Sequence, residues 1–107
     1  MAKLSMEKIK AETEPFDESS YLSSDARIQA FLLEAFESGD PAFIAKCLGI
    51  VAKARNMSRV ARETGLTRQA LYKALSGEGR PEFGTIIKVA RALGYELTVK
   101  PGEQDAA

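Results

Sequence analysis

Residues 57–77 carry the pattern that most constrains the fold of this chain, because they predict two short helices joined by a tight turn, a helix-turn-helix. Ala61 supplies a small side chain where two crossing helices approach closely. Gly65, four residues later, supplies a corner with positive φ at no steric cost. The leucines after this corner are expected to point inward and to hold the second helix on the first: Leu66, Leu71 and Leu75.

Capping residues set the expected limits of these two helices. Ser58 is expected to cap the first helix, about 59–64, and Thr67 the second, about 68–76. Leu66 before the cap and Leu71 at the fourth helical position form a hydrophobic staple, which sets the angle at which the second helix begins.

Two helices are predicted before this unit. The first has Ser24 as its N-cap and ends at Gly39, and its apolar side chains recur at helical spacing: Ile28, Phe31, Leu32, Ala35 and Phe36. The second opens at Asp40-Pro41 and runs to about Arg55, where Asn56 closes it. Its predicted buried stripe is Ile44, Leu48 and Val51.

One helix and one strand are predicted after it. The helix, about 84–93, ends at Gly94 and follows from the spacing of its apolar residues: Phe83, Ile86, Val89, Ala90 and Leu93. Residues 95–100 then alternate apolar and polar side chains, which predicts a short strand that Pro101 stops. No second strand is predicted, so this one should pair with a second copy of the chain or with a partner protein.

The expected fold is therefore mainly all-α: a compact bundle of about five helices that contains the helix-turn-helix, plus one short C-terminal strand. Residues 1–22 are expected to form an N-terminal arm available to a partner. Residues 23–100 form the predicted helical DNA-binding domain, and residues 101–107 form a tail.

Charge is unevenly distributed along the chain. The 15 basic and 15 acidic residues balance overall, but residues 53–100 hold ten basic and four acidic residues, whereas residues 1–52 hold five and nine. The positive part includes the predicted helix-turn-helix, as expected of a local DNA-binding face. The acidic part could face a basic partner, and the alternative is that both parts are ordinary solvated surface.

Composition argues against an enzyme, a metal site or a bound cofactor. The chain has no histidine, no glycine-rich phosphate loop and one cysteine, Cys47, which lies in an apolar helical run and is expected to be a buried small hydrophobe. The first residues lack the apolar stretch of a secretion signal, and no apolar run approaches the length of a membrane span. We therefore expect a cytoplasmic protein.

Seven residues are the candidates for contacts with double-stranded DNA: Ser58, Thr67, Arg68, Gln69, Tyr72, Lys73 and Arg80. Arg68 and Gln69 lie in the first turn of the second helix, where side chains reach base edges. Tyr72 and Lys73 suit phosphates or a thymine methyl group. Thr67, Ser58 and Arg80 suit the DNA backbone. The alternative is that the cations are solvated surface charges and that Tyr72 packs on a neighbouring helix.

Four stretches together resemble the HigA-like addiction-module antidote proteins, a family with a Cro/repressor-type (Xre-like) helix-turn-helix. They are Pro15-Phe16-Asp17 with Tyr21-Leu22, then 39–42 (GDPA), then 58–66 (SRVARETGL), and 71–77 (LYKALSG) followed by Thr85 and Leu93-Gly94. The resemblance implies a DNA-binding antitoxin that neutralises a small toxin, a ribonuclease of the RelE/HigB kind, by direct contact. It also implies a homodimer that represses its own operon at a palindromic operator, with Thr67, Arg68, Gln69, Tyr72 and Lys73 as the DNA readers.

Two other functions fit the sequence. One is a stand-alone repressor without a toxin partner, and the other is a protein-interaction module in which the helix-turn-helix is only a scaffold. For an antitoxin, the acidic N-terminal segment is the expected toxin-binding part, since such toxins are commonly basic.

Overall fold

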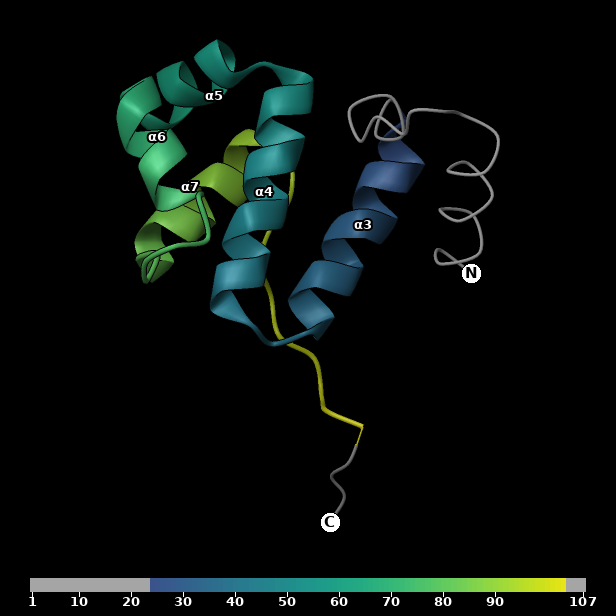
Figure 1. Ribbon diagram of the computed structural model, residues 1–107. Helices are drawn as coiled ribbons and strands as arrows, with labels where there is room; N and C mark the ends of the chain where they lie inside the picture. Colours follow the sequence, from purple (N-terminus) through teal and green to yellow (C-terminus); the bar gives the residue numbers. More distant parts are fainter. Residues whose placement is uncertain (1–23, 104–107) are drawn as a thin grey trace, which may run out of the picture.

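The computed structural model describes residues 24–103, and within this range the chain forms five helices and no strand. They are α3 (Asp25–Glu37), α4 (Pro41–Arg55), α5 (Met57–Thr64), α6 (Arg68–Ala74) and α7 (Phe83–Ala92). α4 is the central helix, because it packs against α3 on one side and also contacts α5, α6 and α7 (Figure 1). The predicted helical class is confirmed. The predicted N-terminal arm, residues 1–22, lies outside the described residues.

Apolar side chains from all five helices meet in one core around α4. The largest fully buried side chains come from four of them: Ile28, Leu48, Val51, Leu71 and Val89. Burying a side chain of this size stabilises a fold by roughly 1.5–3 kcal/mol relative to leaving it in water. Cys47 is 2% exposed and belongs to this core, as predicted. None of the described helices is long and apolar enough to cross a membrane.

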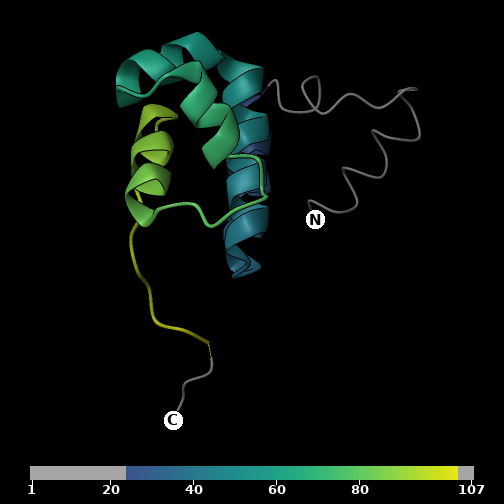
Figure 2. The same cartoon turned by 60° about the vertical axis from the view of Figure 1, so that its left-hand side comes forward.

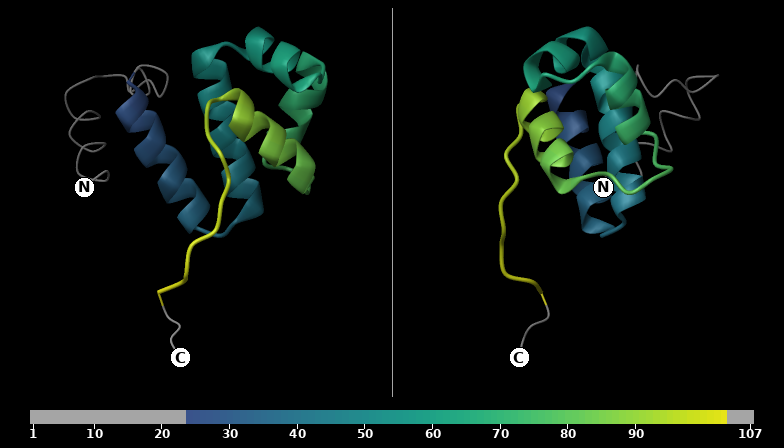
Figure 3. Two further views of the ribbon diagram at one scale, coloured as in Figure 1. Left: turned by 180° about the vertical axis from the view of Figure 1, so that it is seen from behind. Right: turned by 90° about the vertical axis from the view of Figure 1, so that its left-hand side faces the viewer.

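The first two helices begin and end where their capping residues predict. The Ser24 hydroxyl accepts a hydrogen bond from the Arg27 amide, and the Asp40 carboxylate accepts from the first amides of α4. Gly39 takes φ 71 between them, a conformation that a side chain would strain. α3 and α4 are thereby joined as an antiparallel pair that opens away from the turn, as the left view of Figure 3 shows, whereas in Figure 2 α4 lies in front of α3.

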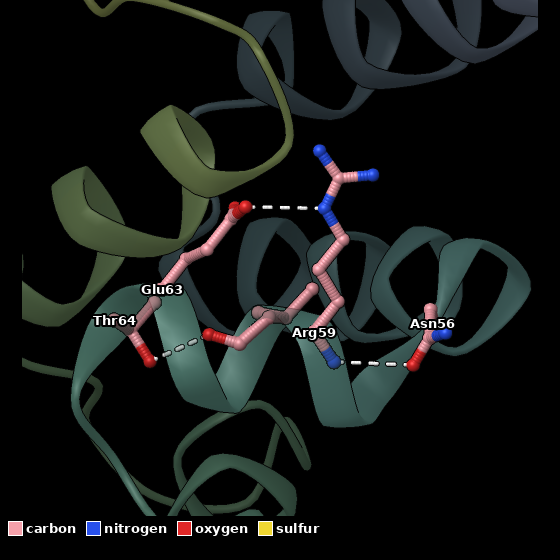
Figure 4. Close-up of polar contacts among 5 residues, drawn as sticks. Asn56, Arg59, Glu63 and Thr64 are labelled. Atoms are coloured by element: carbon pink, nitrogen blue, oxygen red, sulfur yellow. Dashed lines mark hydrogen bonds and ion pairs between the residues drawn. The ribbon is translucent and has the colours of Figure 1, made fainter.

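The predicted cap of α5 is wrong. α5 begins at Met57, so Ser58 lies inside the helix, and the N-cap is Asn56, whose Oδ1 accepts from the Arg59 amide at 3.1 Å (Figure 4). Asn56 is the only residue between α4 and α5, and its amide also donates to the Ala52 carbonyl that ends α4. The physical reason is that α4 continues to Arg55, which leaves no residue other than Asn56 to cap the next helix.

The predicted C-terminal strand is not formed in the single chain. Residues 95–100 leave α7 as an open segment that passes the helices and then extends away from them (Figure 3). A strand needs the hydrogen bonds of a neighbouring strand, and the described residues contain none. The alternation itself is present at the start of the segment, because Tyr95 and Leu97 are partly buried against the core while Glu96 and Thr98 are exposed.

Phe83 differs in burial from the other apolar residues of the last helix. Its spacing matches that of Ile86 and Val89, but its side chain is 71% exposed. Phe83 is the first residue of α7, and the face on which it lies is buried only further along, where Ile86 and Val89 join the core formed with α4 and α5. Periodicity predicts which face is apolar, and the neighbouring helices decide how much of that face is covered.

Candidate nucleic-acid interface

The turn between α5 and α6 is fixed by backbone and side-chain hydrogen bonds. Gly65 has φ 79, and its amide donates to the Ala61 carbonyl at 2.9 Å. The Thr64 hydroxyl donates to the Val60 carbonyl at 2.8 Å and accepts from the Leu66 amide at 3.3 Å. Figure 4 draws a contact between the Thr64 hydroxyl and a carbonyl oxygen of α5. The polar groups at the end of α5 are thus satisfied within the turn, and the chain enters α6 in a defined direction.

Thr67 caps α6 as predicted. Its backbone is extended, with φ −75 and ψ 159, and its hydroxyl accepts from the Ala70 amide at 3.0 Å. Leu66 before the cap is partly buried against the core, and Leu71 at the fourth helical position is fully buried. α6 ends at Ala74, two residues earlier than expected, with Leu75 as its C-cap. The prediction that Leu66, Leu71 and Leu75 point inward is confirmed.

The outward side of α6 brings four of the candidate residues together. Arg68, Gln69 and Lys73 are exposed, and Tyr72 is 42% exposed. They lie between one and five residues apart on a helix that turns Leu71 into the core, so that their side chains share the solvent side. The arrangement offers hydrogen-bond donors, a phenol and an amide to whatever lies against this surface.

Arg80 joins this surface from the loop that follows α6. A groove of about 510 Å³ lies between α6 and the start of α7, and both Lys73 and Arg80 line it. Glu78 and Glu82 line the same groove, so its charge is mixed. Arg80 and Lys73 therefore line the same groove, although Arg80 lies in the loop beyond α6.

Ser58 stands apart from the other candidates. It is exposed at the second position of α5, and it lines none of the described grooves that contain α6 residues. Beside it, the Arg59 guanidinium donates to the Glu63 carboxylate at 3.1 Å, one helical turn along α5 (Figure 4). This ion pair offsets part of the positive charge that α5 contributes.

Two cations on α4 were missed by the sequence analysis. Lys46 and Lys53 line a hollow of about 290 Å³ together with Tyr72. Tyr72 thus lies against α4 on one side while remaining half exposed on the other, so that packing and contact with a ligand are both open to it. The seven-residue spacing of the two lysines places them on one side of a helix, and this was a signal that could have found them.

Gly49 in α4 determines how closely the end of α6 approaches. A Cβ atom built there would lie 2.9 Å from the Leu75 carbonyl oxygen and 3.1 Å from the Leu75 Cβ. The two backbones meet at a distance that only glycine permits. α6 is therefore held against the central helix by backbone contact as well as by buried leucines, which leaves its outward surface free.

Known proteins are similar to this chain over most of its length. Residues 12–101 match the family described as "Probable addiction module antidote protein". An uncharacterized protein of Haemophilus influenzae (strain ATCC 51907 / DSM 11121 / KW20 / Rd) is 44% identical over 85 residues, which cover 79% of this chain and 88% of the relative. No solved structure matches the chain.

Proposed function

This chain belongs to the family of probable addiction module antidote proteins, and from this premise we propose that it is an antitoxin that also binds operator DNA. An antidote acts on a toxin, so a toxin is the first partner. The DNA is the second, and it is proposed from the α5–α6 pair, which would act as a helix-turn-helix.

The observation that carries DNA binding is the outward surface of α6. A short helix capped by Thr67 directs Arg68, Gln69 and Lys73 to solvent while its leucines are buried. A recognition helix needs this division, because one side must hold it to the protein and the other must enter the major groove. The ten basic and four acidic residues of 53–100 supply the electrostatic attraction to phosphates.

Roles follow from position along α6. Arg68 and Gln69 in the first turn would read base edges, Arg to guanine and Gln to adenine. Tyr72 and Lys73, one turn further, would contact phosphates or a thymine methyl group, and Thr67 and Arg80 would contact the backbone on either side. Ser58 would contact a phosphate from the start of α5, and the loss of its capping role leaves its exposed hydroxyl available.

The toxin that we propose is a small ribonuclease of the RelE/HigB kind, neutralised by direct contact in the cytoplasm. The acidic N-terminal segment would attract such a basic protein. Repression of the chain's own operon would require a homodimer, because a palindromic operator presents two half-sites related by two-fold symmetry. The chain would act by binding, without a catalytic step or a cofactor.

Fluorescence anisotropy tests the DNA-binding part directly. The protein is titrated against its own upstream DNA and against a shuffled duplex of the same composition, at two salt concentrations. We expect tighter binding to the upstream DNA, weakening as salt rises. Equal binding to both duplexes, or none, would reduce α5–α6 to a scaffold and favour a protein-interaction module. Binding to DNA without any toxin partner would favour a stand-alone repressor.

A further inference from the structure

In the C-terminal segment 95–100, the backbone beyond Tyr95 is unpaired within the described part of the chain. The Tyr95 amide donates to the Ala90 carbonyl at 2.9 Å, and beyond it no backbone group of residues 96–100 makes a hydrogen bond to the described part of the chain. Val99 is 92% exposed, although Leu97 on the same alternating face packs against the core. A row of free amides and carbonyls with an uncovered apolar side chain is a template for another strand.

We propose that this segment pairs antiparallel with the same segment of a second copy of the chain, in a register centred on Thr98. In this register Glu96 lies opposite Lys100 of the second copy, and Leu97 lies opposite its Val99. Opposite charges facing each other across two strands are stabilising, and like charges are destabilising.

Charge and face together select the register. A shift that pairs residues of unlike faces would place an apolar side chain opposite an exposed polar one. Centring the pairing on Leu97 or Val99 separates Glu96 from Lys100, and centring it on Glu96 or Lys100 sets like charges against each other. Only the register centred on Thr98 pairs residues of the same face and also places Glu96 opposite Lys100.

The backbone determines which amides of the segment face the second copy, and it is compatible with this register. Pairs in an antiparallel ladder alternate between hydrogen-bonded and non-hydrogen-bonded. The register places Tyr95 opposite Pro101, and neither has an amide to give: that of Tyr95 is already used by Ala90, and proline has none. This pair falls in a non-hydrogen-bonded position, so Glu96, Thr98 and Lys100 direct their free amides to the second copy.

The pairing also explains the exposure of Val99. Opposite residues in a ladder point to the same face, so Val99 of one copy lies beside Leu97 of the other. Leu97 packs against its own core. Val99, which its own chain leaves exposed, thus packs beside Leu97 of the second copy and is covered there. The inference rests on the homodimer of the proposed function, but it requires no DNA.

Charge reversal tests the register in the full-length chain. Glu96→Lys and Lys100→Glu each place like charges opposite each other at both ends of the ribbon, and both residues are exposed in the single chain. We expect each to raise the dimer dissociation constant about tenfold in sedimentation equilibrium, and the double variant to return it to the wild-type value. Lys88→Glu, an exposed reversal on α7, is the matched control and should leave it unchanged.

Cross-linking tests the centre of the register. Thr98→Cys places two thiols opposite each other at a Cα separation of about 5.5 Å, which a disulfide spans. Glu96→Cys places them about 13 Å apart along the ribbon, which it cannot. Wild type, with only the buried Cys47, reports the background.

A chain that stays monomeric, single reversals without effect, or Thr98→Cys chains that cross-link no faster than Glu96→Cys chains would each overturn the proposal. A monomer whose reversals weaken binding to another protein would assign the segment to that partner instead. Because all these measurements are made without DNA, their outcome is independent of whether α6 binds an operator.

Discussion

Arg68 and Gln69 differ from Lys73 in what their side chains can recognise. A guanidinium and a carboxamide each offer two groups in a fixed geometry, which matches the paired groups on the edge of a base. An ammonium is a point charge that suits any phosphate. Their places on α6 follow the same division, with the first two in the turn next to Thr67 and the lysine one turn further.

Substitution of the first-turn residues should therefore reduce specific binding. We expect Arg68→Ala or Gln69→Ala to weaken binding to the operator by about 1–3 kcal/mol and to relax base preference at one position. Anisotropy titrations with single-base variants of the operator measure both effects. Arg62→Ala removes an exposed charge on α5 as the matched control. If it costs as much as Arg68→Ala, the effect is general electrostatics rather than base readout.

Lys73→Ala should behave differently, because a phosphate contact carries no sequence information. We expect binding to weaken alike for operator and shuffled DNA, and the dependence of log K on log salt to lose about one unit of slope. A salt series on both duplexes measures this, with Lys88→Ala as the control. Loss confined to the operator would show that Lys73 reads a base.

At the scale of the helices, α6 depends on its approach to α4. The Cβ introduced by Gly49→Ala would meet the Leu75 carbonyl at 2.9 Å, and one of the two backbones must then move. Such overpacking typically costs about 1–3 kcal/mol, against roughly 1 kcal/mol gained from the helix propensity of alanine.

We therefore expect Gly49→Ala to lower the free energy of unfolding and to weaken DNA binding, as measured by urea denaturation and anisotropy. Gly84→Ala in α7 is the matched control, because a Cβ there has no heavy atom within 4 Å. It should leave stability unchanged or raise it. Equal effects from both substitutions would show that the close contact is not what positions α6.

The helices also show what sequence can and cannot predict. Ser24, Asp40 and Thr67 were assigned as caps correctly because capping is local, needing only an oxygen near an amide two or three residues on. Ser58 was assigned wrongly, since Asn56 and Ser58 are both good caps and the choice depends on where α4 ends. The exposure of Phe83, the nearness of Lys46 to Tyr72 and the Gly49 contact depend on how helices pack, which no local pattern encodes.

For the whole molecule, the division of charge along the chain suggests a division of partners. The described positive segment includes α5 and α6, while residues 1–22 carry more acidic than basic side chains. Opposite signs on separate segments let one protein attract a polyanion and a basic protein at different places.

Deletion of residues 1–22 tests this division. We expect weaker binding to the toxin and unchanged binding to operator DNA, because the deletion spares α3 to α7. Surface plasmon resonance with each partner in turn measures both affinities. Undiminished toxin affinity would place the toxin contact within the described helices instead.

Asn56 is the single residue between α4 and α5. Its amide donates to the Ala52 carbonyl at the end of the first helix, and its side chain accepts from the Arg59 amide at the start of the second, so one residue holds both helix ends. The start of α5 is therefore tied to the end of α4. A partner that displaced the end of α4 would also displace the start of α5, and with it the helix that α5 packs against, α6.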